Sequence, residues 1–306
     1  MPTIVPISVS AYVADPMHIF AGPNDVWMVD YTSGLNQITT PGLVQSQING
    51  ISDQQAACYG PDGNIWVTSA FSTGRIAKIQ TASPHTITYY TGIPSKQGIC
   101  VGPDGNIWTV YGNTIRANNT SGAILISTVA PGSSSLRRIC VGPDGNMWAC
   151  DADNGNIYKI TLAGVVTVMA LLGGNAYDIC TGPDGNLWVA NLSQHSVWQV
   201  APAGGGTEFP LAGRGGTSAP WGICKGPDGN LWVADYGAEI WSVTPAGVGT
   251  YYETAALGQS YPNAICLGGD GNLYASDAYG TGISINKVWQ VLFVKGGMSH
   301  GKHRMH

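Results

Sequence analysis

The segment Gly60-Pro61-Asp62-Gly63-Asn64-Ile65-Trp66 decides the fold, because the same pattern returns through most of the chain. Further copies begin at Gly102, Gly142, Gly182 and Gly226, and degenerate copies begin at Gly22 and Gly268. Successive copies start 38, 42, 40, 40, 44 and 42 residues apart, which gives seven units in a chain of 306 residues. Self-similarity at a period of about 20–50 residues is the sequence signature of solenoids, propellers and related arrays.

Each unit is predicted to form four short strands, as the third unit illustrates. An apolar run at 98–101 ends at the turn 103–106, where Asp-Gly is a strong hairpin signal because glycine tolerates positive φ. Strand-like runs follow at 107–110, 114–117 and 123–127. Four strands in about 40 residues are typical of a propeller blade. The predicted fold is therefore all-β: a seven-bladed β-propeller with four-stranded antiparallel blades.

The beginning of the chain is predicted to complete the last blade. The seventh unit has strand-like runs at 264–267, 273–276 and 287–292, and a polar stretch follows them. The run Thr3–Val9 precedes the first unit, so we expect it to supply the outermost strand of the seventh blade. Such a strand would pair an otherwise open sheet edge. Pro6 suits this outer position because proline has no backbone N–H to donate.

The repeated motif residues are predicted to be structural. The aromatic residue that ends each motif would fill the layer between neighbouring blades, where one ring buries about 150–250 Å². These aromatic residues are Trp27, Trp66, Trp108, Trp148, Trp188, Trp232 and Tyr274. The motif aspartates are interpreted as turn residues that bond their own backbone rather than as calcium ligands.

Six of the seven cysteines recur at one place on successive first strands: Cys58, Cys100, Cys140, Cys180, Cys224 and Cys266. Because packed sheets lie about 10 Å apart and bridged cysteines need Cα atoms within roughly 7 Å, we expect these thiols to stay reduced. A bridge between Cys140 and Cys150 is geometrically feasible but is not expected. Free thiols, together with a first segment that does not read as a signal peptide, indicate synthesis in the cytoplasm.

The overall composition excludes several classes of protein. Charged residues make up 10% of the chain and hydrophobic residues 44%, which excludes a coiled coil, a helical bundle and a charge-rich disordered chain. A formal net charge of −5 argues against a nucleic-acid partner, which normally requires a basic face. No apolar run approaches the ~18 residues of a membrane span, so none is expected.

The run Trp221-Gly222-Ile223-Cys224-Lys225-Gly226-Pro227-Asp228-Gly229-Asn230-Leu231-Trp232-Val233 resembles the repeats of the virginiamycin B lyase family, the streptogramin-opening enzymes. All seven units fit this pattern, so the resemblance covers roughly residues 1–294, which we expect to form one propeller domain. The resemblance implies a metal-dependent active site on one face of the propeller. That face would carry the loops before each first strand and after each second strand.

The residues that the resemblance implies for catalysis are mostly replaced in this chain. Lyases of this kind place a histidine before the Gly/Ala-Ile of each of the last two units, and glutamates near the final one. Trp221 and Asn263 occupy the histidine positions, and Tyr261 and Asp277 occupy the glutamate positions. Elimination from a lactone ester needs a base, and neither Trp221 nor Asn263 can be one. We expect no catalytic residue, no metal site and no cofactor, with Mg²⁺ needed only for a rearranged lyase site.

Aromatic and polar side chains dominate this face instead. We predict that the ligand-binding residues at the channel mouth are Gln97, Tyr177, Trp221, Tyr236, Tyr261, Asn263 and Asp277. Tyr and Trp give large contact area at low entropic cost, which suits sugar rings or a protein partner. The alternative is that these are ordinary loop residues. Asp30, Asp151 and Asp235 end second strands around the same mouth, whereas His85 and His195 are expected in outer connections.

The favoured function is a non-catalytic recognition or structural module that binds a glycan or a protein partner at the loop face. A low-charge chain rich in Gly, Ser, Thr and Tyr suits a phage tail or other virion component. Residues 295–306 form a basic, histidine-rich tail, which we expect either to anchor the protein to an assembly or to be disordered. The alternatives are a streptogramin B lyase-like enzyme that opens a lactone ring by elimination, and an intracellular scaffold of the NHL-repeat type.

Overall fold

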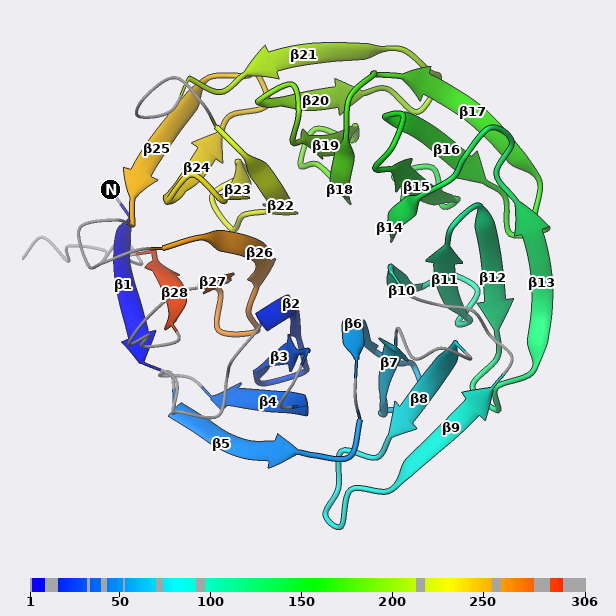
Figure 1. The fold of residues 1–306 in the computed structure, drawn as a ribbon. Coiled ribbons are helices and arrows are strands. Elements are labelled where there is room, and N and C mark those ends of the chain that lie inside the picture. Colours follow the sequence, from blue (N-terminus) through cyan, green and yellow to red (C-terminus); the bar gives the residue numbers. More distant parts are fainter. Residues whose placement is uncertain are drawn as a thin grey trace, which may run out of the picture.

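The chain folds into seven four-stranded antiparallel sheets arranged in a ring (Figure 1). The computed structural model describes residues 2–8, 16–31, 34–39, 43–51, 53–69, 74–91, 97–212, 218–254, 260–277 and 287–293. The first strand of each blade lines the central opening and the fourth forms the outer rim. The predicted fold, an all-β seven-bladed β-propeller, is confirmed. The described part of the chain contains no helix with the length and apolar character needed to cross a membrane.

The strands follow the repeat from blade to blade. The first three blades are β2 (Pro16–Ala21), β3 (Val26–Asp30), β4 (Gly34–Thr39), β5 (Leu43–Ile48); β6 (Gln54–Tyr59), β7 (Ile65–Ser69), β8 (Arg75–Ile79), β9 (Ile87–Thr91); and β10 (Ile99–Val101), β11 (Ile107–Tyr111), β12 (Thr114–Asn118), β13 (Ile124–Val129). The next three are β14 (Leu136–Val141), β15 (Met147–Asp151), β16 (Asn156–Ile160), β17 (Val166–Leu171); β18 (Ala176–Thr181), β19 (Leu187–Asn191), β20 (Ser196–Val200), β21 (Gly206–Pro210); and β22 (Pro220–Lys225), β23 (Leu231–Asp235), β24 (Glu239–Val243), β25 (Gly249–Glu253). The seventh contains β26 (Pro262–Leu267), β27 (Leu273–Asp277), β28 (Lys287–Leu292) and β1 (Thr3–Ser8).

Strand β1 closes the ring as predicted. It pairs antiparallel with β28, in a register that runs from Thr3 opposite Leu292 to Ser8 opposite Lys287. The strand therefore ends one residue earlier than the predicted run, and Val9 lies outside the described residues. Ile7 of β1 is buried in a cluster with Ile19 of the first blade, so the first and last blades share a core. The predicted tail, 295–306, also lies outside the described residues.

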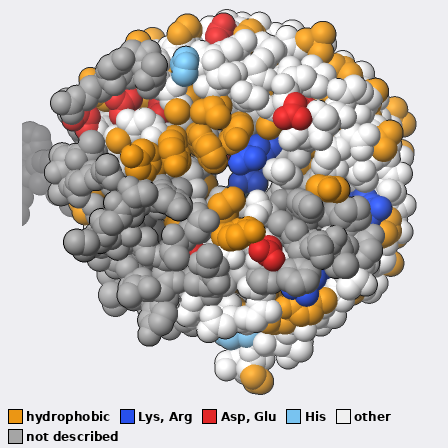
Figure 2. All heavy atoms as spheres, viewed as in Figure 1, with side chains coloured by type: hydrophobic (Ala, Val, Ile, Leu, Met, Phe, Trp, Pro, Cys, Tyr) orange, Lys and Arg blue, Asp and Glu red, His pale blue; other side chains and the backbone are white. Residues whose placement is uncertain are grey.

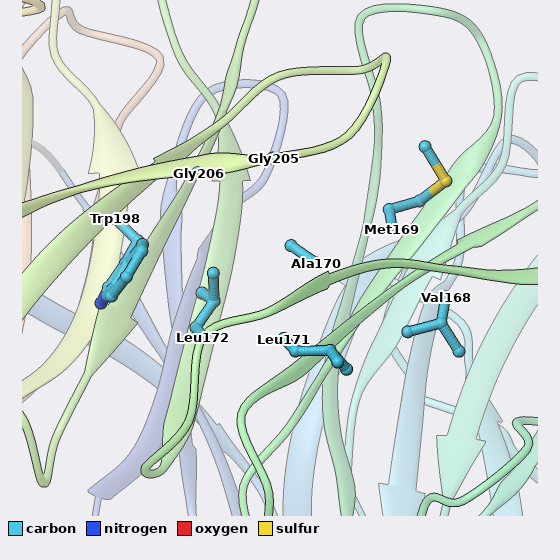
Figure 3. Close-up of a pocket in the computed structure, with 8 residues that line it drawn as sticks. All are labelled: Val168, Met169, Ala170, Leu171, Leu172, Trp198, Gly205 and Gly206. Atoms are coloured by element: carbon cyan, nitrogen blue, oxygen red, sulfur yellow. The ribbon is translucent and has the colours of Figure 1, made fainter.

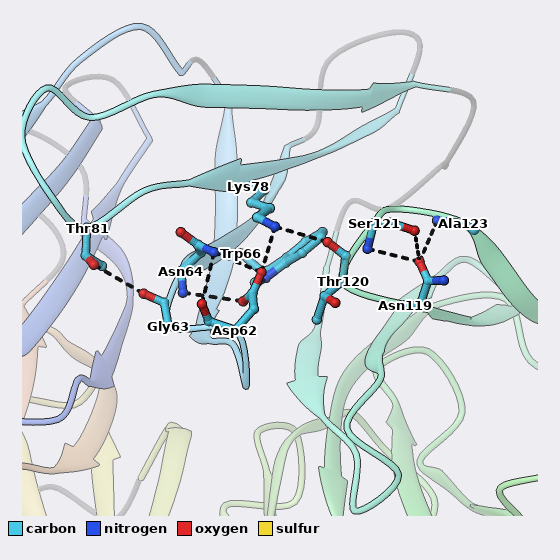
Figure 4. A network of polar contacts seen from close by, with 10 residues as sticks. All are labelled: Asp62, Gly63, Asn64, Trp66, Lys78, Thr81, Asn119, Thr120, Ser121 and Ala123. Carbon is cyan, nitrogen blue, oxygen red and sulfur yellow. Dashed lines mark hydrogen bonds and ion pairs between the residues drawn. The ribbon is translucent and has the colours of Figure 1, made fainter.

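The repeated turn holds the motif aromatic residue in a fixed position (Figure 4). The indole Nε1 of Trp66 donates to the Oδ1 atom of Asp62 at 3.1 Å, and the backbone N–H of Asn64 donates to the same oxygen at 3.3 Å. A Cβ atom on Gly60 would lie 2.5 Å from the indole Cδ1, so only glycine leaves room for the ring. Lys78 lies 2.8 Å from Oδ2 of Asp62 and also donates to the Thr120 carbonyl of the next blade at 3.1 Å.

Each motif aromatic residue packs against the following blade. Trp66 is fully buried and clusters with Ile99 and Ile107 of the third blade. The last aromatic residue, Tyr274, clusters with Ile19 and Val26 of the first blade, so the pattern runs around the whole ring. The predicted packing role of these residues is confirmed.

All seven cysteines are free thiols, as predicted, including Cys140 and Cys150. Burial raises the pKa of Cys100 to about 11 and that of Cys150 to about 12. These groups are therefore protonated at neutral pH and act as small apolar side chains.

Replacing Asp62 tests the contribution of the turn to stability. Burial alone raises the pKa of Asp62, but hydrogen bonds from Lys78, Trp66 and Asn64 outweigh it and lower the pKa to about 2. The ionised carboxylate therefore stabilises the fold above 3.8, the ordinary pKa of an aspartate, and this contribution is lost as the pH falls towards 2. We expect Asp62→Ala to lower the free energy of unfolding by about 1–3 kcal/mol at pH 7, measured by chemical denaturation.

The matched control is the equivalent turn of the third blade. Asp104 accepts the Trp108 indole N–H at 3.1 Å, and among the described residues no ammonium group forms an ion pair with it. Asp62→Asn should therefore destabilise the protein by about 0.5–1 kcal/mol more than Asp104→Asn. Equal effects of the two asparagine variants would show that the Lys78 contact contributes nothing.

Candidate functional site

The channel-mouth face is built on β-bulges in the first strands. In β14, Leu136 pairs with Asp151 and Arg138 with Cys150, so Arg137 is an extra residue with no direct partner. The same irregularity occurs in six of the seven first strands, at Met17, Gln55, Arg137, Tyr177, Trp221 and Asn263. A bulge interrupts the ladder and re-aims a side chain. The extra residue falls at the position that the resemblance implied for catalysis. The backbone therefore distinguishes this position from the regularly paired residues of the strand.

Four aromatic rings from three adjacent blades form a continuous row at the mouth. The ring centroids of Tyr177 and Trp221 lie 4.6 Å apart, those of Trp221 and Tyr236 lie 5.2 Å apart, and those of Tyr236 and Tyr261 lie 4.8 Å apart. All four side chains are half-buried, so part of each ring still reaches solvent. We call Tyr177, Trp221, Tyr236 and Tyr261 the aromatic row.

A guanidinium group ends the row. The Cζ atom of Arg137 lies 3.9 Å from the ring centroid of Tyr177 and 5.5 Å from that of Trp221. Its Nη1 donates to the Oε1 atom of Gln97 at 3.5 Å, which links the third blade to the row. Figure 2 shows hydrophobic side chains next to the central opening, with Lys or Arg side chains directly beside them. Five of the seven predicted residues (Gln97, Tyr177, Trp221, Tyr236 and Tyr261) therefore lie together.

The other two predicted residues, Asn263 and Asp277, are each 7% exposed and have structural partners. Asn263 donates from Nδ2 to the Pro16 carbonyl at 2.6 Å and accepts from the Ser276 hydroxyl at 2.7 Å, so it joins the seventh blade to the first. Asp277 accepts from the Tyr261 backbone N–H at 2.6 Å. These two side chains support the mouth from beneath rather than extending the aromatic row.

Aspartates at the ends of second strands fix the loops that carry the mouth residues. Asp235 accepts from the backbone N–H groups of Ala219 and Gly237, both at 2.7 Å, and from the Ser218 hydroxyl. Asp277 accepts from the Ser260 hydroxyl at 2.8 Å and from the Trp289 indole at 2.9 Å. In the fourth blade, Asp151 accepts from the backbone N–H groups of Ser134, Ser135, Asp153 and Asn154. The described residues directly before β14, β22 and β26 are therefore held in place.

Sequence reasoning missed a second layer of residues, one position further into the channel. Asp178 accepts from the backbone N–H groups of Ile179 and Ile223, both at 2.9 Å, and so bridges the fifth and sixth blades. Burial raises the pKa of Asp178, while the nearby Arg138 partly offsets the rise. His18 accepts from the Ala57 N–H at 3.4 Å, and its pKa is well below the usual value because of burial and the charge of Arg138. Asp178, His18 and Arg138 each follow a bulge residue directly. This shared repeat position is the sequence signal that could have identified them.

A family model described as the virginiamycin B lyase family matches residues 127–287, more than half of the chain. The chain belongs to this family. No curated protein matches it.

The solved structures similar to this lyase-family propeller share its fold. A catalytically inactive histidine-to-alanine variant of virginiamycin B lyase from Staphylococcus aureus, solved with quinupristin, has a TM-score of 0.84 at 21% identity and covers 96% of this chain and 100% of that chain. A streptogramin B lyase has a TM-score of 0.82 at 20% identity, covering 95% and 97% of the two chains. An extracellular domain from B. thetaiotaomicron, assigned to a hybrid two-component system, has a TM-score of 0.72 at 14% identity and covers 95% of this chain and 42% of that chain.

The residues at the family's catalytic positions do not fit a metal ion. Trp221 has no ligand atom, both ends of the Asn263 amide are bonded, and Asp277 is the one acid left. Within the described ranges no three His, Cys, Asp or Glu side chains cluster as a metal site requires. His85 lies in an outer connection as expected, but His195 follows β19 on the mouth face, and its Nδ1 contacts the Ser218 carbonyl.

A separate apolar pocket lies on the outer rim between the fourth and fifth blades (Figure 3). It has a volume of about 630 Å³ and is lined by Val168, Met169, Ala170, Leu171, Leu172, Trp198, Gly205 and Gly206. The one polar side-chain atom of this lining, Nε1 of Trp198, already donates to Gln194 at 2.9 Å. The pocket therefore offers apolar contact without directional chemistry, unlike the mouth.

Substitutions of Asp178 test how this buried carboxylate contributes to stability. Because burial raises its pKa in the folded state, ionisation of Asp178 opposes folding as the pH rises above the unfolded value. Asp178→Asn removes the buried charge and keeps one of the two acceptor oxygens, so it should lose less stability at pH 7 than Asp178→Ala. Asp178→Ala should lose about 1–3 kcal/mol because the Ile223 N–H loses its acceptor. Denaturant unfolding at pH 4 and pH 7 measures both effects, and equal losses in the two variants would contradict this account.

Proposed function

We propose that this propeller is a non-catalytic recognition module that binds a glycan or a protein partner at the channel mouth. The observation that carries the proposal is the aromatic row, which presents four half-buried rings in contact with one another. Half-buried Tyr and Trp side chains supply large contact areas at low entropic cost. The loops beneath them are fixed by Asp235 and Asp277, so little ordering is required when a ligand binds.

Replacing Trp221 tests this proposal. Trp221 lies in the middle of the row, between Tyr177 and Tyr236, so Trp221→Ala should separate the two halves and weaken ligand binding by about tenfold or more. Screening the wild-type protein against a glycan array and a partner-protein library identifies the ligand, and titration calorimetry measures the effect of the variant. Trp198→Ala is the matched control, because it removes an indole that lines the outer-rim pocket and does not belong to the aromatic row. A ligand whose affinity is equal for both variants would contradict the proposal.

A streptogramin B lyase-like enzyme is the second candidate, because the chain belongs to the lyase family and its fold superposes on a structure solved with quinupristin. Catalysis would require a base, and Trp221 and Asn263 at the family's histidine positions supply none. Incubating the protein with quinupristin and Mg²⁺ should leave the lactone intact in mass spectrometry, and EDTA should not change ligand binding. Ring opening would overturn the non-catalytic proposal.

We also propose that the protein works as a virion component, such as part of a phage tail. The support is a rigid ring with a low-charge surface rich in Gly, Ser, Thr and Tyr, which suits an exposed structural protein. Its presence in purified particles, measured by mass spectrometry, tests the location independently of the ligand.

A further inference from the structure

One arginine stands at the end of the aromatic row, and a second follows it directly in the sequence. Arg137 is the bulge residue of β14 and Arg138 follows it on the channel wall. The face of the Arg137 guanidinium lies on Tyr177, which leaves the N–H groups at its edge for other acceptors. Of the described residues, Gln97 provides one such acceptor at 3.5 Å, and no carboxylate comes within ion-pair distance of either arginine.

The acid nearest to this pair does not neutralise it. Asp178 attracts both arginines electrostatically, but its two oxygens accept the backbone N–H groups of Ile179 and Ile223. Arg137 and Arg138 are consecutive in β14, and Tyr177 covers one face of the Arg137 guanidinium. Burial lowers the pKa of Arg137, and the charge of Arg138 lowers it further. Two like charges held close together there destabilise each other, and a bound anion would relieve this repulsion.

Three other acids of this face are engaged by neighbouring loops. Asp151, Asp235 and Asp277 accept hydrogen bonds from loop N–H and hydroxyl groups. The backbone N–H groups that donate to these carboxylates cannot also donate to the backbone of a bound peptide. The groups at the mouth that can contact a ligand are therefore aromatic rings and the N–H groups at the edges of the guanidinium groups. The planar fork of arginine matches the geometry of a carboxylate.

We propose that Arg137 and Arg138 bind the carboxylate of an acidic sugar whose ring packs on Tyr177 and Trp221. This inference rests on the proposed function and specifies its ligand class: a glycan that contains uronic or sialic acid. The carboxylate lies between the two guanidinium groups, and the adjoining sugar rings follow the aromatic row towards Tyr236 and Tyr261.

The experiment uses hyaluronan, alginate and polygalacturonate oligosaccharides and sialyllactose, each compared with its carboxyl-reduced form by titration calorimetry. The acidic form should bind, and carboxyl reduction should weaken binding by about tenfold or more, because charge-assisted hydrogen bonds are lost. Arg137→Gln and Arg138→Gln should produce a similar loss. Asp178→Asn should strengthen binding severalfold because it removes the competing negative charge. Arg116→Gln removes the same charge from β12 and should leave the affinity unchanged.

Three results would overturn the inference: equal affinity for acidic and carboxyl-reduced sugars, arginine variants that behave like Arg116→Gln, or no binding of any acidic sugar at millimolar concentration. A preference for a peptide with a free carboxylate over every acidic sugar would overturn it as well. If Trp221→Ala abolishes binding of both sugar forms while the arginine variants do not, the acidic specificity is wrong and the recognition function stands. If Trp221→Ala has no effect on any ligand, the recognition function itself fails.

Discussion

In five of the seven blades, the hydrogen bond between the motif indole and the carboxylate of its own turn fixes how one blade packs against the next. Asp62 accepts the Trp66 indole N–H, and Gly60 leaves the space that the ring occupies. The bond fixes the ring on the side of the sheet that faces the next blade, where it joins a core with Ile99 and Ile107. In the seventh blade, the Tyr274 hydroxyl makes the equivalent bond to Asp270 at 2.9 Å. In six of the seven blades this local contact thereby holds the ring that packs against the next sheet.

The mouth also combines residues held in place by hydrogen bonds with side chains that differ from blade to blade. The bulge directs one residue out of the regular ladder in six of the seven first strands, and an aspartate at the end of the second strand holds residues of the preceding loop. Asp151 and Asp235 use their carboxylates for this purpose in the fourth and sixth blades. The hydrogen bonds to these aspartates do not depend on which side chain the bulge residue has, since Arg137 and Trp221 occupy equivalent positions. Ligand contacts can therefore change without altering the blades.

The repeat period, the Asp-Gly turns and the strand-like run at the start of the chain were sufficient to predict the blades and their closure by β1. The repeat also predicted that most of the mouth residues lie close together, because equivalent positions of the repeat meet around the axis of the propeller. The burial of Asn263 and Asp277 could not be predicted, because it depends on contacts with Pro16, Tyr261 and Trp289 made only after the ring closes. Arg137 was not among the predicted ligand-binding residues, because its contact with Tyr177 depends on the distance between adjacent bulges.

Membership of a lyase family and a recognition function are compatible because each blade contributes its mouth residue independently. A base at the bulge position of β22 would perform chemistry, whereas the indole of Trp221 packs against Tyr177 and Tyr236. At the bulge position of β26, Asn263 uses its amide to join the first and last blades, so this position contributes stability instead of proton transfer. These two positions therefore supply aromatic contact area and rigidity, which in the proposed function would favour binding of a ligand in its ground state. Catalysis requires interactions that are stronger in the transition state, and neither residue supplies a charge or a proton for one.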